Sequence, residues 1–138
     1  INAPHEPYVF DREGNFRYTN NPEDNLPYYT DTVVYLNKRV LELVDVLISE
    51  SAPPPVIILQ GDHGAHVLTS GADKHKILSA YLLPADAEAD LYPAITPVNT
   101  FRVVLRHLFG AELELLPDMV YLRNGEELTP VESACEIN

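Results

Sequence analysis

An acidic side chain and an imidazole are neighbours in the tetrapeptide Gly61-Asp62-His63-Gly64. Carboxylate oxygens and imidazole nitrogens both bind divalent cations, and the two glycines allow a sharp turn that brings both side chains to one ion. The pair predicts half of a metal site that favours Mn²⁺ or Zn²⁺ and is also compatible with Mg²⁺ or Ca²⁺. In the alternative interpretation, Asp62 caps a following helix and His63 is a solvated surface residue.

Three further histidines follow, and only the first is a candidate for the same site. His66 lies close behind His63 in the sequence and is a candidate ligand or supporting group. His75 lies between two lysines, which is typical of a solvated surface. His107 falls near the end of a predicted helix, where a favourable interaction with the helix dipole accounts for it. Neither His75 nor His107 is expected to be catalytic.

A fifth histidine lies between two prolines, in the motif Pro4-His5-Glu6-Pro7-Tyr8. Prolines fix the backbone in an extended conformation, so the loop can hold the His5 imidazole in one direction at a low entropic cost. This makes His5 a candidate for orienting a substrate. The alternative is a proline-rich surface turn.

The aliphatic run of residues 56–59 predicts the strand that positions Asp62 and His63. It shows no polar alternation, which is typical of a strand buried on both faces, as in a parallel sheet covered by helices. In open α/β sheets ligands bind beyond the carboxyl ends of the strands, and the acid and the imidazole follow this strand directly. A second apolar run, residues 77–83, ends at a proline and predicts another strand.

Two amphipathic helices are predicted around these strands. The first runs from Thr30 to about Ser51, is capped by Thr30 or Asp31, and ends before three consecutive prolines. Its apolar stripe consists of Val33, Leu36, Val40, Leu43, Val44 and Leu47, widened by Val34, Leu41 and Ile48. The second helix covers residues 99–109 and ends at Gly110. Its buried face is expected to contain Phe101, Val104, Leu105 and Leu108.

Strands that alternate with helices predict an α/β fold, in which helices cover both faces of a layered sheet. The expected organisation is one domain over residues 1–138. Residues 1–29 form an irregular segment with a short hairpin around Gly14. Residues 30–122 form the α/β core and include a last short strand or hairpin edge at residues 119–122. Residues 123–138 are a tail.

Charge and composition exclude several classes of function. Nine basic and 21 acidic side chains give a net charge of −12, which leaves no electrostatic basis for binding nucleic acid. No stretch approaches the roughly 18 apolar residues of a membrane span. The single cysteine, Cys135, rules out an internal disulfide. No Gly-x-Ser-x-Gly motif occurs, which argues against a Ser-His-Asp hydrolase.

The order of these motifs resembles a known family. A Pro-His-x-Pro-Tyr motif is followed by an amphipathic helix with Leu41, Asp45 and Ile48 near its end, then by an aliphatic strand leading into Asp-His-Gly, and then by a strand ending in proline. This order is similar to the carboxy-terminal part of the sulfatase-like branch of the alkaline phosphatase superfamily. Within that branch it most resembles the membrane-anchored sulfatase-domain proteins, which include phosphoglycerol transferases and lipoteichoic acid synthases. The resemblance covers about residues 3–118.

The resemblance implies a partial, carboxy-terminal portion of an alkaline phosphatase-like fold and assigns roles to its residues. Asp62 and His63 look like ligands of the catalytic divalent metal, and His5 looks like the histidine that contacts the phosphate or sulfate ester substrate. His66 and Lys74 fall where relatives place polar groups that face the pocket. The implied reaction is hydrolysis or transfer of the ester by a Ser, Thr or formylglycine nucleophile. A parent with an amino-terminal anchor would be membrane-associated, with an extracytoplasmic catalytic domain.

The family places its nucleophile and other acidic metal ligands upstream of the Pro-His motif, and the sulfatase maturation signature is missing around Cys135. We therefore expect the metal site to be incomplete in this chain and the chain to be inactive by itself. Apolar edges left by the missing half are expected to favour self-association. The alternative function is a complete small acidic α/β binding module with no catalytic activity.

Overall fold

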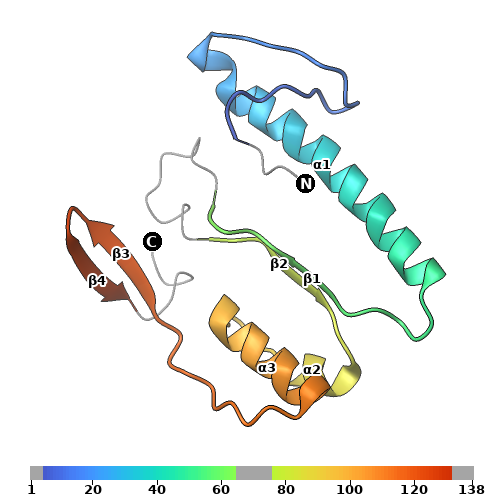
Figure 1. The fold of residues 1–138 in the computed structure, drawn as a ribbon. Helices are drawn as coiled ribbons and strands as arrows, with labels where there is room; N and C mark the ends of the chain where they lie inside the picture. The colour runs from blue at the N-terminus through green and yellow to red at the C-terminus, as the bar shows by residue number, and fades with distance from the viewer. Residues whose placement is uncertain (1–4, 65–75, 132–138) are drawn as a thin grey trace. The chain divides into compact units, whose positions relative to one another are not determined.

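The computed structural model describes residues 5–64 and 76–131, which contain helices and two small antiparallel sheets (Figure 1). This mixed α/β content agrees with the predicted class. The described residues belong to two compact units, residues 5–55 and residues 56–64 with 76–131. The expectation of one domain over residues 1–138 stays a prediction. Within the described ranges, no helix combines the length and the apolarity that a membrane crossing requires.

The first unit begins with the irregular segment and contains the predicted hairpin around Gly14. Phe10 and Phe16 form an isolated antiparallel bridge across the turn. The Asp11 carboxylate accepts hydrogen bonds from the backbone N–H groups of Glu13 (3.0 Å) and Asn15 (2.8 Å), which closes the turn. Gly14 has φ of 90°, and a Cβ at this position would overlap the ring of Tyr35, so the turn requires glycine.

Helix α1 (Asn25–Glu50) follows a short 3-10 turn, η1 (Pro22–Asp24), and begins earlier than the predicted Thr30. A proline in the first helical turn is tolerated because the first N–H groups of a helix have no acceptor within it. The predicted caps therefore lie inside the helix, where the Thr30 hydroxyl donates to the Leu26 carbonyl at 2.9 Å. The end of the helix, before the extended Ser51, agrees with the prediction.

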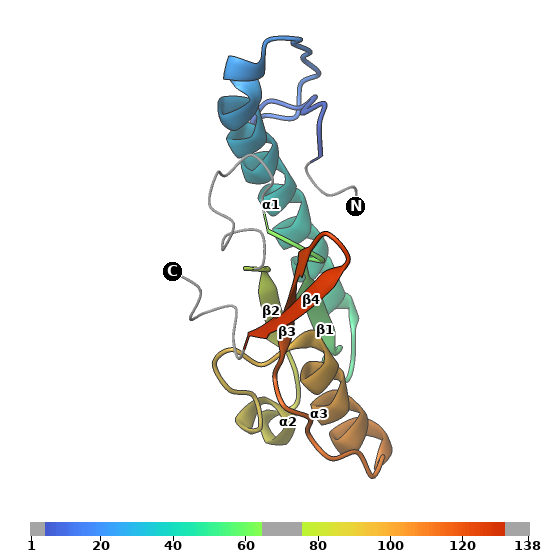
Figure 2. The same ribbon diagram turned by 90° about the vertical axis from the view of Figure 1, so that its left-hand side faces the viewer.

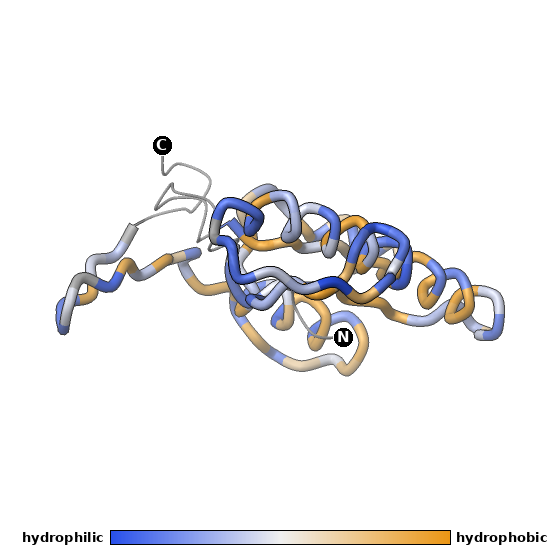
Figure 3. The backbone as a smooth tube through the Cα atoms, turned by 90° about the horizontal axis from the view of Figure 1, so that it is seen from above, coloured by the Kyte–Doolittle hydropathy of each residue, from blue (hydrophilic) through white to orange (hydrophobic). Residues whose placement is uncertain are grey.

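The apolar stripe predicted for α1 is only partly buried. The irregular segment packs on the amino-terminal half, where the rings of Phe10 and Tyr35 lie 5.3 Å apart and Thr32 is buried. Further along the helix, Leu41 is 63% exposed and Ile48 is 46% exposed. Figure 3 shows apolar positions recurring along the helical turns. The first unit by itself therefore leaves the second half of the predicted stripe exposed, because its irregular segment packs on the amino-terminal half of α1.

The second unit contains strands β1 (Ile57–Gln60) and β2 (Ser79–Leu82), which were both predicted. They pair antiparallel, with Ile57 opposite Leu82 and Gln60 opposite Ser79. The expected parallel arrangement is therefore wrong for this pair. An apolar run indicates burial but does not determine the direction of the neighbouring strand. Of the four residues of β1, only Ile57 is buried.

Helices α2 (Ala85–Ala89) and α3 (Pro97–Phe109) pack against this pair of strands (Figure 2). Helix α2 is only one turn long and was not expected from the sequence. Gly110 ends α3 in the left-handed conformation, with φ of 64°, as predicted. The core of the unit consists of Leu83, Ala87, Val103 and Val104, with Ile58 and Tyr81 of the strands packed against it.

The buried face of α3 differs from the predicted one. Val104 is buried as predicted, together with Asn99, Thr100 and Val103, whereas Phe101, Leu105 and Leu108 are 47%, 38% and 37% exposed. The observed buried face is rotated relative to the predicted one because it contains two polar residues, Asn99 and Thr100. Their hydrogen bonds allow them to be buried, and a pattern of apolar residues does not reveal such bonds. The Asn99 side chain binds the backbone of Leu116, and the Thr100 hydroxyl lies 3.1 Å from the Tyr81 hydroxyl.

The last described element is a hairpin of β3 (Val120–Asn124) and β4 (Glu127–Val131). Its two-residue loop begins at Gly125, which has φ of 65°. Positive φ is the conformation that tight hairpin loops require and that glycine adopts readily. The predicted hairpin edge is confirmed, but its second strand lies in the segment that was expected to be a tail.

Candidate metal centre

Asp62 and His63 lie in the loop that follows β1, and their side chains turn toward each other. The Asp62 Oδ1 atom accepts a hydrogen bond from the His63 N–H at 3.0 Å. The second carboxylate oxygen, Oδ2, lies 3.7 Å from His63 Nε2. The Asp62 side chain is 78% exposed and the His63 side chain 34% exposed. The acid and the imidazole therefore converge at a place that solvent can reach.

The tautomer of His63 follows from the contact that its second ring nitrogen, Nδ1, makes. His63 Nδ1 lies 2.7 Å from the carbonyl oxygen of Gly64. A carbonyl oxygen only accepts hydrogen bonds, so Nδ1 carries the proton, and the lone pair of the neutral ring is on Nε2. Metal-binding histidines commonly donate their second N–H to a backbone carbonyl in this way. The ring is thus oriented with its ligand atom toward Asp62.

The spacing of the two donor atoms fits a first-row divalent cation. Such ions bind carboxylate oxygen and imidazole nitrogen at about 2.0–2.2 Å, so one ion can contact two donors up to roughly 4.2 Å apart. The observed separation of 3.7 Å meets this condition. Catalytic sites usually have three protein ligands. In residues 5–64 and 76–131, no three or more His, Cys, Asp or Glu side chains form a group that could hold a metal.

Of the predicted site residues, the structure describes Asp62, His63 and His5. His5 is exposed and belongs to the first unit, whereas Asp62 and His63 belong to the second. The loop that carries it is tied to α1, because Asn25 Nδ2 donates to the Glu6 carboxylate at 2.6 Å. Its role in contacting an ester stays a prediction. His66, Lys74 and His75 lie outside the described residues.

A cleft in the first unit was missed by the sequence analysis. It has a volume of about 360 Å³ and is lined by Glu6, Pro7, Tyr8, Tyr18, Thr19, Asn20, Asn25 and Tyr28. The irregular segment and the first turn of α1 form its wall. The available signal was the concentration of tyrosine and asparagine in residues 1–29, because these residue types together are more typical of a binding surface than of a core.

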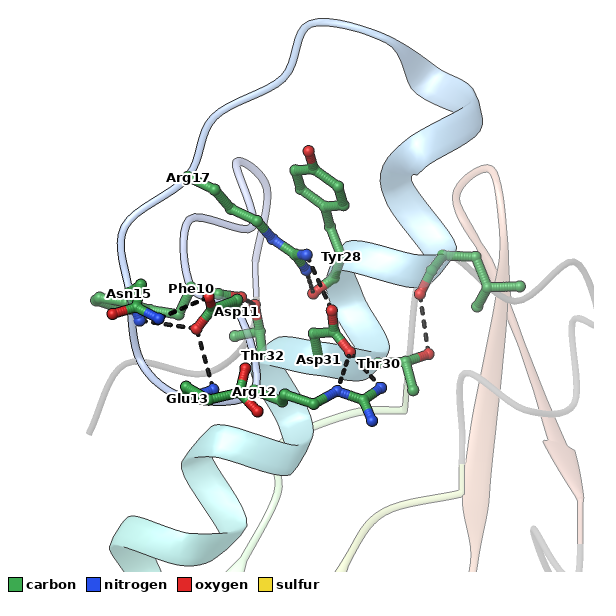
Figure 4. Close-up of polar contacts among 11 residues, drawn as sticks. Phe10, Asp11, Arg12, Glu13, Asn15, Arg17, Tyr28, Thr30, Asp31 and Thr32 are labelled. Atoms are coloured by element: carbon green, nitrogen blue, oxygen red, sulfur yellow. Dashed lines mark hydrogen bonds and ion pairs between the residues drawn. The ribbon is translucent and has the colours of Figure 1, made fainter.

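An ion-pair cluster beside this cleft fixes the irregular segment on α1 (Figure 4). Arg12 donates through Nε (3.0 Å) and Nη2 (2.7 Å) to one oxygen of Asp31, and Arg17 donates to the other at 2.9 Å. The guanidinium of Arg17 also lies 3.6 Å from the centroid of the Tyr28 ring. The hydrogen bonds from Arg12 and Arg17 hold the pKa of Asp31 below its usual value.

His107 belongs to a second ionic cluster. The sequence had suggested that its position near the end of a helix was explained by the helix dipole. Its Nε2 lies 2.8 Å from Asp90 and its Nδ1 lies 3.2 Å from Asp86, so two carboxylates face the two ring nitrogens. Both nitrogens can donate only when the ring is protonated. The hydrogen bonds to Asp90 and Asp86 accordingly raise the pKa of His107, and His107 in turn lowers the pKa of Asp86. The cluster joins α2 to α3.

This cluster is expected to make the second unit less stable at alkaline pH. A folded-state pKa above the unfolded value of about 6.5 gives stabilisation that is complete below that value and is lost as the pH rises through the raised pKa. The melting temperature of the wild type should therefore exceed that of His107→Gln at about pH 6 and approach it at about pH 9. Thermal unfolding of both proteins across this range measures the effect. A difference that is independent of pH would contradict it.

Comparisons of the chain with protein-family models, with curated proteins and with solved structures found no match.

Proposed function

We propose that this chain is the carboxy-terminal portion of a metal-dependent phosphate or sulfate ester hydrolase or phosphoglycerol-type transferase, and that Asp62 and His63 hold its cation. The observation that carries this proposal is the convergence of Asp62 Oδ2 and His63 Nε2, with the imidazole oriented by the Gly64 carbonyl. The resemblance of the motif order to the sulfatase-like branch supports the same conclusion. A layered alkaline phosphatase-like sheet with helices on both faces is part of the proposal.

In this function each residue of the proposed site has a defined task. Asp62 supplies a negatively charged oxygen and His63 a neutral nitrogen, and the Gly64 carbonyl keeps the imidazole in the tautomer that can bind a cation. His5 donates a hydrogen bond to the transferring group or to the leaving oxygen of the ester. A divalent cation, when bound, lowers the pKa of a hydroxyl nucleophile and neutralises charge that develops on the ester.

Assays with p-nitrophenyl phosphate and p-nitrophenyl sulfate in the presence of Mn²⁺ or Zn²⁺ test this proposal. We expect no turnover by the 138-residue chain and turnover by a longer polypeptide in which a nucleophile-bearing half precedes it. The reason is that the 138-residue chain contributes two metal donors and one ester-binding histidine to the proposed site, whereas the nucleophile belongs to the preceding half. Equal rates for the two polypeptides would show that the proposed division of the site is wrong.

A small acidic binding module remains the second candidate. The observation that favours it is that the described residues supply two metal ligands at Asp62 and His63, fewer than a catalytic site usually has. The same assay separates the two candidates. A longer natural polypeptide that turns over neither ester would favour the binding module.

A further inference from the structure

The cleft in the first unit is lined by residues between Glu6 and Tyr28, and this lining indicates what it can bind. Its volume of about 360 Å³ falls in the range of small-molecule sites, roughly 300–1,000 Å³. Three tyrosines contribute rings and hydroxyl groups to it, and two asparagines contribute amides. A ligand that matches this lining needs apolar faces together with many hydrogen-bonding groups.

The charges at the cleft argue against an anionic ligand. No lysine, arginine or histidine lines it, and Glu6 is its one charged residue. The chain as a whole carries a net charge of −12. A phosphate or carboxylate in this cleft would be desolvated without a cationic partner, which is unfavourable.

The same residues argue against an organic cation. An ammonium group is held best by several accessible ring faces. The Arg17 guanidinium already lies on the Tyr28 ring at 3.6 Å, and Tyr8 is buried, with its ring edge-to-face against Tyr29 at 5.6 Å. These contacts leave Tyr18, which is 59% exposed, as the accessible ring of the cleft.

We propose that the cleft binds a neutral pyranose sugar, with one face of the sugar ring on Tyr18 and its hydroxyl groups on Asn20 and Glu6. The axial C–H bonds of a pyranose form an apolar face that packs on an aromatic ring, and amide and carboxylate groups bind pairs of sugar hydroxyls. The wall of the cleft begins at Glu6, directly after His5. If the proposed function holds, the sugar is a part of the ester substrate or of the acceptor.

Titration of the ¹⁵N-labelled chain with methyl α- and β-D-hexopyranosides, followed by NMR, tests the proposal without requiring catalysis. We expect saturable shift changes at Tyr18 and Asn20. Tyr18→Ala should weaken binding about tenfold, because it removes the stacking surface. Tyr18→Phe keeps the ring and should retain most of the affinity. Tyr121→Ala, which removes a similarly exposed ring (57%) in the hairpin of the second unit, should bind like the wild type.

The outcomes are distinct from those of the ester assay. Saturable binding that Tyr18→Ala weakens and Tyr18→Phe retains supports the sugar site even if no ester is turned over. Three results would overturn it: no saturable shift with any of the glycosides, equal affinity for wild type and Tyr18→Ala, or stronger shifts at the same residues with choline than with the glycosides. Unchanged dispersion of the remaining NMR signals shows that each variant is folded.

Discussion

Replacing Asn99 by alanine is expected to lower the free energy of unfolding of the second unit by about 3 kcal/mol. The side chain is completely buried in α3. Its amide nitrogen donates to the Leu116 carbonyl at 2.7 Å and to Asp118 at 3.0 Å, and its oxygen accepts the Leu116 N–H at 2.9 Å. Alanine would remove the partner of both the N–H and the carbonyl of Leu116 and would leave a gap where the completely buried amide had been, and both losses destabilise the fold.

The effect is expected to be large because Asn99 belongs to a network. Asp118 accepts a hydrogen bond from the Thr96 N–H at 2.7 Å at the start of α3, and it also accepts one from the Tyr92 hydroxyl. Although burial alone would raise the pKa of Asp118, the hydrogen bonds from Thr96, Tyr92 and Asn99 lower it. Loss of Asn99 therefore weakens both the start of α3 and the attachment of the segment that follows the helix.

Urea unfolding of the variant measures this loss. Val98→Ala is the matched control, because Val98 neighbours Asn99 on the same helix and is 56% exposed. We expect the control to change the free energy of unfolding by less than about 0.5 kcal/mol. Similar unfolding curves for the two variants would mean that the buried network contributes little to stability.

The second prediction concerns turnover in the longer, active polypeptide of the proposed function. Asp62→Asn keeps the shape of the side chain but removes its charge, and His63→Gln removes the imidazole nitrogen that faces the acid. Each substitution is expected to lower kcat for a phosphate or sulfate ester by about a hundredfold or more, because a metal ligand is lost. Higher Mn²⁺ concentrations should restore part of the activity if the loss arises from weaker cation binding.

Two substitutions of the same chemical kind provide controls. Asp45→Asn changes an exposed carboxylate of α1, and His107→Gln changes the histidine of the α2–α3 ion cluster. Both should retain activity within about threefold at a pH where the variants are folded. Activity of Asp62→Asn and His63→Gln at the level of these controls would be incompatible with a metal-binding role.

The sequence predicted those elements whose signals are local. The apolar periodicity of α1 and the glycine at the end of α3 both act over a few residues, and they correctly predicted that a helix ends near Ser51 and that α3 ends at Gly110. The convergence of the Asp62 and His63 side chains was also expected from the sequence. The two residues are adjacent and flanked by glycines, so their convergence does not depend on contacts with distant parts of the chain. The hydrogen bond from His63 to Gly64, which orients the imidazole, was not expected.

The features that the sequence did not predict depend on contacts between residues that are far apart in the chain. The antiparallel pairing of β1 with β2 is a property of two segments, and the aliphatic run of β1 contains no information on direction. The buried face of α3 was misassigned because Asn99 is polar, yet it is buried by partners that come 17 residues later in the chain. The cleft beside Tyr18 was missed for the same reason, since its walls come from two separate segments.

Mn²⁺-induced broadening of NMR signals from the 138-residue chain tests the central claim most directly, because paramagnetic broadening detects even weak binding to an incomplete site. We predict that substoichiometric Mn²⁺ broadens the signals of residues 61–64 first, and that Asp62→Asn or His63→Gln abolishes this selectivity. Broadening that is spread over the acidic surface, or that is unchanged by these two substitutions, would contradict cation binding by Asp62 and His63.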